Sequence, residues 1–173
     1  MREPVLPRPA HAYVALGSNL DGPEQRVEKA IADLDKLPST RLLARSSLYR
    51  TAPVGYADQP DFVNAVALLE TSLDAESLLA SLFELERAAG RERCIPNGPR
   101  TLDLDLLLHG NRAMDTDALT LPHPRLHERA FVLLPLAEIA PELEIPGRGR
   151  VRHLAWRAAA VQSAERMHDH RVA

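Results

Sequence analysis

Two aspartates lie close together in the segment TLDLDLLLHG, residues 101–110. Side chains of a strand alternate between its faces, so Asp103 and Asp105 should share one face, about 6.6 Å apart along the chain. The leucines should share the opposite face: Leu102, Leu104, Leu106 and Leu108. Like charges on one face repel, and a divalent cation held between the carboxylates would remove that penalty. Carboxylate oxygens suit Mg²⁺, although the same spacing also occurs on a solvated strand face.

Basic residues flank this acidic pair on both sides in the sequence. Arg91, Arg93 and Arg100 precede it, in or beside a loop with glycine and proline, and His123 and Arg129 follow it. Arginines hold phosphate oxygens that a metal leaves free, so the combination predicts a metal–polyphosphate site. Taken one at a time, the arginines fit a hydrated surface, and His123 fits a turn between two prolines. The sequence contains neither a P-loop motif nor a set of zinc ligands.

An aromatic residue and an amide are placed to share another strand face. Phe62 and Asn64 lie two residues apart at the start of an apolar segment. Such a pair can stack against a flat heterocycle and hydrogen-bond its edge. By spacing alone, core packing of Phe62 is the more common explanation. Gly17, which follows an apolar segment and precedes Ser18 and Asn19, is expected to form a tight turn.

Hydrophobic periodicity predicts strands and helices in the order β-α-β-β-α-β. The expected strands are residues 12–16, 41–49, 62–70 and 101–108. The expected helices are residues 22–37 and 74–89, followed by two more at about 125–140 and 151–164. This order predicts an α+β fold with a ferredoxin-like core, in which an antiparallel sheet carries the first two helices on one face. The additional C-terminal helices are expected to cover the other face and give a three-layer α/β/α arrangement.

Composition places the chain among ordinary globular proteins. We expect residues 1–173 to form one domain, with residues 1–11 as a loose arm and about 165–173 as a loose tail. The formal net charge of -3 gives no general attraction to nucleic acid or to anionic membranes. Cys94 is the only cysteine, which excludes an internal disulfide and favours a reducing compartment. With no secretory signal or membrane-spanning segment in the sequence, we expect a cytoplasmic protein.

Several segments together resemble the 6-hydroxymethyl-7,8-dihydropterin pyrophosphokinase family. The segment GPRTLDLDLLL, residues 98–108, is similar to the signature of that family. Other similar segments follow in the family's order: ALGSNL (15–20), SSLYRTAPVG (46–55), QPDFVNAV (59–66), LPHPRLHERAFVLLPL (121–136) and EIAPEL (138–143). The resemblance covers about residues 12–143 and implies a ferredoxin-like sheet with extra helices, in agreement with the predicted order of elements.

The resemblance implies an enzyme of folate biosynthesis that transfers diphosphate from ATP to the hydroxymethyl group of the dihydropterin and releases AMP. It implies that Asp103 and Asp105 hold two Mg²⁺ ions, and that Arg91, Arg100 and Asp105 are catalytic. The implied ATP-binding residues are Glu86, Arg93, Arg100, Leu106, Thr120, His123 and Arg129. The implied pterin-binding residues are Thr51, Ala52, Val54, Phe62, Asn64 and Phe131, with the two phenylalanines on either side of the ring.

The chain departs from the common family pattern at three positions. Asn97 stands where many relatives have a tryptophan, and Ala118 and Pro124 stand where relatives often have an arginine and a tyrosine. Arg125 is a candidate to replace one of the lost ATP contacts. The resemblance further implies a monomer whose ligands are ATP and the pterin.

Two other functions are consistent with the residues. One is a Mg²⁺-dependent phosphohydrolase. The other is a non-catalytic ferredoxin-like domain that binds nucleotides or RNA through aromatic residues on its sheet. The acidic pair and the negative net charge weigh against RNA.

Overall fold

The computed structural model describes residues 8–20, 22–53, 58–90 and 101–167. A six-stranded sheet forms its centre, with strands in the order β10-β3-β4-β1-β5 and with β2 also paired to β4. All of these pairings are antiparallel. The bounds are β1 Ala10–Ser18, β2 Thr40–Arg45, β3 Tyr49–Thr51, β4 Phe62–Thr71, β5 Asp103–His109 and β10 Glu165–Arg166. Two small hairpins pair β6 (Met114–Asp115) with β7 (Thr120–Leu121), and β8 (Glu144–Ile145) with β9 (Gly149–Arg150).

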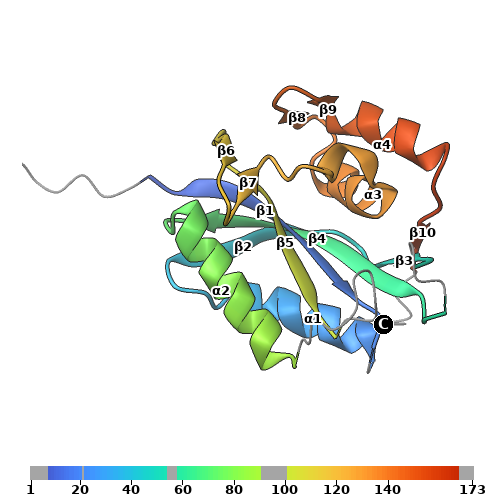
Figure 1. Ribbon diagram of the computed structural model, residues 1–173, viewed down its shortest axis with the longest axis horizontal. Coiled ribbons are helices and arrows are strands. Elements are labelled where there is room, and N and C mark those ends of the chain that lie inside the picture. The colour runs from blue at the N-terminus through green and yellow to red at the C-terminus, as the bar shows by residue number, and fades with distance from the viewer. Residues whose placement is uncertain (1–7, 21, 54–57, 91–100, 168–173) are drawn as a thin grey trace, which may run out of the picture.

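Helices cover both faces of this sheet (Figure 1). On one face lie α1 (Pro23–Leu34) and α2 (Ala75–Ala88). On the other lies α3 (Ala130–Ile139), with α4 (Val151–Ala159) packed against it. A short 3₁₀ helix, η1 (Leu126–Glu128), leads into α3. In the described ranges, no helix has the length and apolar character needed to cross a membrane.

Each helical layer shares its own hydrophobic core with the sheet. The α1–α2 core includes Val14 of β1 and Leu82 of α2. The α3–α4 core includes Val66 of β4 and Leu133 of α3. Strand side chains therefore alternate between two separate cores, as the period of a strand buried on both faces requires.

The predicted fold class is confirmed. The spatial order β5-β1-β4-β2 is that of a ferredoxin-like sheet, and both core helices lie on one face. The C-terminal helices form the third layer, as predicted. The predicted helix over residues 125–140 is divided at Arg129, which has extended backbone angles between η1 and α3.

The prediction of one strand over residues 41–49 is wrong, because the chain breaks between β2 and β3. Ser46 is buried at this break, and its N–H donates to the Val66 carbonyl at 2.8 Å. Its hydroxyl accepts from the Val66 N–H at 2.9 Å, so a side-chain oxygen replaces a backbone acceptor in the ladder. The chain then shifts before β3 pairs with the first residues of β4.

A β-bulge in β5 reverses the predicted orientation of Leu108. Tyr13 pairs with Leu108 and Val14 with Leu106, which leaves Leu107 without a pairing partner in β1. Two residues of a bulged strand oppose one of its partner, so the alternation of faces is reversed beyond the bulge. Leu107 and Leu108 both lie in the α3–α4 core. The remaining leucines lie in the α1–α2 core as predicted: Leu102, Leu104 and Leu106.

Strand pairing extends into both segments that were predicted to be loose. Ala10 pairs with Thr71, and Arg166 pairs with Tyr49. Residues 1–7 and 168–173 lie outside the described ranges. The assignment of residues 1–173 to a single domain stays a prediction.

Candidate active site

Three neighbouring strands place the acids and the amide on one face of the sheet. In the register, Gly17 of β1 pairs with Asp103 of β5 on one side and with Asn64 of β4 on the other. Directly paired residues of an antiparallel sheet share a face, so Asp103, Gly17 and Asn64 form one row, which we call the acid–amide row. Asp105 pairs with Ala15 in the next row of the same face. This is the face that α3 covers farther along the strands, and both aspartates are half-buried.

Gly17 is the member of this row that sequence reasoning missed. It lies inside β1 and not in a turn, so the prediction of a tight turn is wrong. A Cβ atom at this position would lie 3.0 Å from Oδ1 of Asn64, closer than a carbon normally approaches an amide oxygen. The Asn64 amide therefore leans over β1, in the direction of Asp103. The only signal in the sequence is a glycine within an apolar strand, a position that often marks close approach.

Thr51 sets the orientation of the Asn64 amide. Nδ2 of Asn64 donates to Oγ1 of Thr51 at 2.8 Å, and both residues are buried. Thr51 lies on β3 directly opposite Phe62 of β4. Among the described residues, Phe62 belongs to neither hydrophobic core, which argues against simple core packing. The strand ends thus bring a hydroxyl, an amide and an aromatic ring to one place.

Positive charge faces the two acids. Burial and the neighbouring Arg125 lower the pKa of Arg129, while Asp105 and Asp103 oppose that shift. Burial, together with the charges of Arg129 and Arg125, lowers the pKa of His123 to about 4, although Asp103 acts in the opposite direction. His123 is therefore neutral at pH 7. These couplings bring His123 and Arg129 together with the acids, although in sequence they are separated from them by the β6–β7 hairpin.

Phe131 lies in the first turn of α3, partly buried against the α3–α4 core. The guanidinium carbon of Arg129 is 5.5 Å from the centroid of its ring. This is cation–π distance, so the arginine and the ring are held side by side near the start of the helix. Arg129 has extended backbone angles and is the N-cap residue of α3.

Three other predicted residues lie around the outer edge of β5 instead of on its acidic face. Glu86 is buried on α2, and the Leu106 side chain is buried in the α1–α2 core. Thr120 lies on β7. The His123 N–H donates to the Leu107 carbonyl at 2.9 Å, so the chain after β7 runs along this edge. A ligand that contacts all of these residues would have to extend around the edge strand β5. It could contact only the backbone of Leu106, because the Leu106 side chain is buried in the core.

Several predicted residues cannot be placed in this arrangement. Val54, Arg91, Arg93 and Arg100 lie outside the described residues, as does Asn97. Ala52 is exposed just after β3. Ala118 and Pro124, the other departures from the family pattern, are both exposed.

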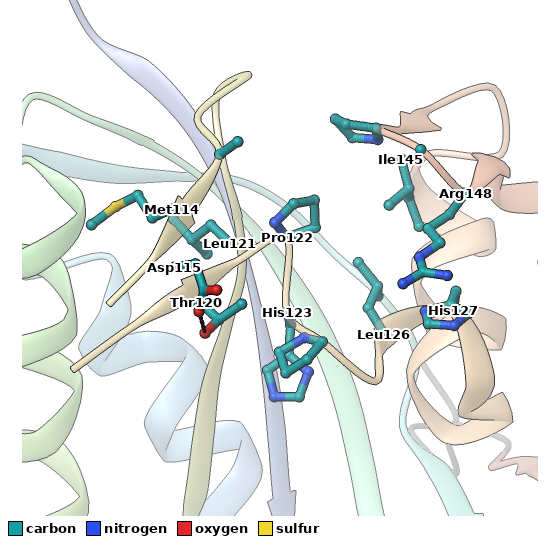
Figure 2. Close-up of a pocket in the computed structure, with 14 residues that line it drawn as sticks. Met114, Asp115, Thr120, Leu121, Pro122, His123, Leu126, His127, Ile145 and Arg148 are labelled. Carbon is teal, nitrogen blue, oxygen red and sulfur yellow. Dashed lines mark hydrogen bonds between the residues drawn. The ribbon is translucent and has the colours of Figure 1, made fainter. Parts of the chain in front are cut away.

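A cleft of about 610 Å³ adjoins the acidic face at His123. Figure 2 shows Asp115 and Thr120 on one side of this cleft and His127 and Arg148 on the other, with His123 between them. Among the described residues that line it, Asp103, Asp105 and Asn64 are absent. The hollow thus lies beside the acids and does not include the acid–amide row, in which Gly17 and Asn64 are buried and Asp103 is half-buried.

The donor set on β5 fits Mg²⁺. The parts of the chain that the structure describes hold no group of three acidic, histidine or cysteine side chains around one point. A closed zinc or calcium cage is therefore not built by these residues. Two carboxylates on one strand face leave coordination positions for phosphate oxygens and water, which is how Mg²⁺ is usually bound.

Comparison with known proteins agrees with these features. Residues 13–141 match the model of the 7,8-dihydro-6-hydroxymethylpterin-pyrophosphokinase family. The chain belongs to this family. Every described residue of the acid–amide row falls inside the matched range.

Curated members of the family from two bacteria are similar over most of their length. A 2-amino-4-hydroxy-6-hydroxymethyldihydropteridine pyrophosphokinase of Pseudomonas aeruginosa is 49% identical over 148 residues, covering 86% of this chain and 90% of the relative. The enzyme of the same name from Bacillus subtilis is 44% identical over 133 residues, covering 77% and 80%.

Solved structures agree in fold. A wild-type HPPK-DHPS of Plasmodium falciparum, with pteroate, aligns with a TM-score of 0.68 over 88% of this chain, at 13% identity. The chain spans 43% of the length of that protein. A second Plasmodium HPPK-DHPS structure, with pterin and p-hydrobenzoate, gives a TM-score of 0.66 over 88% of this chain and 45% of the other. At this identity the likeness concerns the fold alone.

Proposed function

We propose that this family member transfers the β,γ-diphosphate of ATP to the hydroxymethyl group of 6-hydroxymethyl-7,8-dihydropterin, in folate biosynthesis. The observation that carries the proposal is the row Asp103–Gly17–Asn64. It spans two strand spacings, about 10 Å, between a carboxylate suited to a metal–phosphate complex and an amide suited to a heterocycle. A phosphate donor and a flat acceptor can therefore meet above β1.

In this proposal Asp103 and Asp105 hold two Mg²⁺ ions together with the ATP phosphates. When bound, the ions would neutralise phosphate charge and stabilise the charge that develops during transfer. Arg129 faces the same carboxylates and would grip phosphate oxygens that the ions leave free. We retain Arg91 and Arg100, with Asp105, as the proposed catalytic residues.

The proposed nucleotide contacts wrap around the edge of β5. They comprise Glu86, Arg93, Arg100, the Leu106 backbone, Thr120, His123 and Arg129. His123 would be a neutral hydrogen-bonding group there, because its pKa is about 4. A neutral imidazole can donate to a phosphate or ribose oxygen without adding charge.

The proposed acceptor site uses the other end of the row. Phe62 and Phe131 would stack on the two faces of the pterin ring. The Asn64 nitrogen donates to Thr51, which fixes the orientation of the amide. The Asn64 oxygen would then accept a hydrogen bond from a donor on the edge of the pterin ring. Thr51, Ala52 and Val54 would supply the remaining contacts. A buried amide with one fixed orientation discriminates between ring edges that offer a donor and edges that offer an acceptor.

In the proposed reaction the pterin hydroxyl oxygen attacks the β-phosphorus of ATP. The bond from that phosphorus to the α–β bridging oxygen breaks, AMP leaves, and the hydroxyl proton passes to solvent. The chain contributes by holding both substrates in line and by fixed positive charge, which are the main sources of rate in phosphoryl transfer. A side chain that acts as a strong base is not required.

The decisive experiment is AMP formation from ATP and Mg²⁺, with and without the dihydropterin. A pyrophosphokinase produces AMP only when the acceptor is present, together with one pterin diphosphate per AMP. AMP or ADP formed at the same rate without acceptor would instead indicate a phosphohydrolase, and no turnover would indicate a binding domain. We also propose that the protein is a monomer, because one chain supplies every group in the proposed site. Sedimentation with both ligands tests this oligomeric state. We further propose a cytoplasmic location.

A further inference from the structure

The carboxylate of Glu138 joins three segments that are far apart in the sequence. Its oxygens accept from the Ser47 N–H at 3.0 and 3.1 Å, from the Ser47 hydroxyl at 2.7 Å and from the Tyr49 hydroxyl at 2.8 Å. Arg166 adds an ion pair at 3.3 Å. We call these four residues the Glu138 cluster. It connects the last turn of α3 to the segment that enters β3 and to β10.

The protonation states suit this arrangement. Burial opposes ionisation of Glu138, but the hydrogen bonds from Ser47 and Tyr49 outweigh it and lower its pKa below the ordinary value. Burial and the bond to Glu138 raise the pKa of Tyr49. At neutral pH a carboxylate therefore accepts from a phenol, which is a charge-assisted hydrogen bond.

The strands that the cluster holds are too short to be held by their ladders alone. β3 has three residues and β10 has two. Their pairing places Glu165 opposite Arg50 and Arg166 opposite Tyr49, and the Met167 N–H donates to the Leu48 carbonyl at 2.8 Å. Figure 1 shows β10 beside β3 at one edge of the sheet, below α3. Strand pairs of this length gain little stability without added contacts.

The cluster adjoins the proposed acceptor site. Tyr49 pairs directly with Asn64 in the register, and Thr51 of the same strand accepts from the Asn64 amide at 2.8 Å. A shift of β3 along β4 would therefore move the Thr51 hydroxyl away from the amide that it orients. A one-residue slip would turn Thr51 to the opposite face.

The aspartates, by contrast, lie on β5, at the opposite edge of the sheet. Three strand boundaries separate β3 from β5 in the order β3-β4-β1-β5. That distance is about 14 Å across the strands. A change at the cluster should affect the acceptor end of the site and leave the metal–nucleotide end intact.

We propose that Glu138 and Arg166 are positioning residues for the pterin, which hold β3 in register so that Thr51 fixes the Asn64 amide for the acceptor. The inference rests on the proposed function and deepens it. It assigns the C-terminal strand, after α4, to the support of the acceptor site. Neither residue contacts a substrate in this account.

The test compares Glu138→Gln, Tyr49→Phe and Arg166→Ala with a matched control, Glu142→Gln. Glu142 lies just beyond the end of α3 and forms ion pairs with Arg150 and Arg152, neither of which belongs to the Glu138 cluster. We measure the KM for pterin and for ATP, kcat, and the melting temperature. Glu138→Gln should raise the KM for pterin about tenfold, because charge-assisted bonds to Ser47 and Tyr49 are lost.

The KM for ATP should stay within about twofold in the same variants, and Glu142→Gln should change neither constant. Arg166→Ala should raise the KM for pterin about threefold with little change in melting temperature, since exposed ion pairs add little to stability. A parallel rise in both KM values, or a fall in melting temperature without a change in the pterin KM, would overturn the proposal.

If Glu138→Gln does not fold, Arg166→Ala decides the question, because Arg166 is 60% exposed and its loss leaves no buried cavity. Unchanged pterin affinity in Arg166→Ala and Tyr49→Phe would then reject the role. Failure of the proposed function has a different result, since the unsubstituted chain itself would make no AMP with pterin present.

Discussion

Replacing Gly17 with alanine should separate binding of the acceptor from binding of the nucleotide. The added Cβ would lie 3.0 Å from Asn64 Oδ1 and 3.9 Å from the Val63 carbonyl oxygen; apart from its chain neighbours, no other atom of the described residues lies within 4 Å. Gly17 has ordinary strand backbone, so alanine introduces no backbone strain. Because no aspartate atom is within 4 Å of the new methyl group, the groups proposed for the metals are not touched.

The size of the effect follows from what the Asn64 amide must do. To clear the methyl group its oxygen has to move a few tenths of an ångström, while its nitrogen stays bound to Thr51. The amide then rotates off the ligand, and a buried polar group that loses its partner costs about 1–3 kcal/mol. This corresponds to a loss of roughly ten- to a hundredfold in pterin affinity.

Titration calorimetry with the pterin and with a non-hydrolysable ATP analogue plus Mg²⁺ measures both affinities directly. We expect the ATP analogue to bind Gly17→Ala within about twofold of the original chain. The melting temperature should stay equal or rise slightly, because alanine reduces the entropy of the unfolded chain. Combining the change with Asn64→Ala should add no further loss, since the two act through one amide. Unchanged pterin affinity, equal losses for both ligands, or fully additive effects would refute the reasoning.

Three further predictions concern other parts of the site. Asp103→Asn should lower Mg²⁺-dependent kcat by roughly a hundredfold or more in the AMP assay. Circular dichroism should show that this variant still folds. Near-normal turnover would contradict the metal assignment. Phe62→Ala should weaken pterin binding by about 1–3 kcal/mol, the usual contribution of a stacked ring, and should change binding of the ATP analogue little. Equal losses of affinity for both ligands would mean that Phe62 is only structural. The pKa of His123 is lowered from 6.5 to about 4, so the unfolded chain takes up this proton at higher pH than the folded chain does. In the ligand-free protein the free energy of unfolding should therefore fall as pH drops from 6.5 to about 4. Urea unfolding of His123→Gln should show a shallower dependence in that window, and an identical slope would exclude the contribution.

Features that depend on short-range periodicity were predictable from the sequence. The alternation in β5 placed Asp103 and Asp105 on the face opposite Leu102, Leu104 and Leu106, and the structure agrees. The helical stripes and the order of elements likewise predicted the ferredoxin-like core. These predictions hold because the side-chain direction within one element follows from its own period.

Features that depend on a partner strand were not predictable. Leu108 changed faces because β5 bulges against β1, and the strand predicted over residues 41–49 broke because the Ser46 hydroxyl bonds to Val66 of β4. Nothing within either segment specifies these contacts. Each depends on what lies across the ladder, which is set only when the sheet assembles.

By itself, the sequence determined the groups that could do chemistry: a pair of carboxylates on one strand face, an amide two residues from an aromatic ring, and the motifs of a pterin pyrophosphokinase. Only the tertiary structure decided that Gly17 lies between Asp103 and Asn64, and that Glu138 reaches Tyr49 across the sheet edge. The physical reason is that local periodicity fixes which way a side chain points, whereas cross-strand register and helix docking decide which side chains it meets.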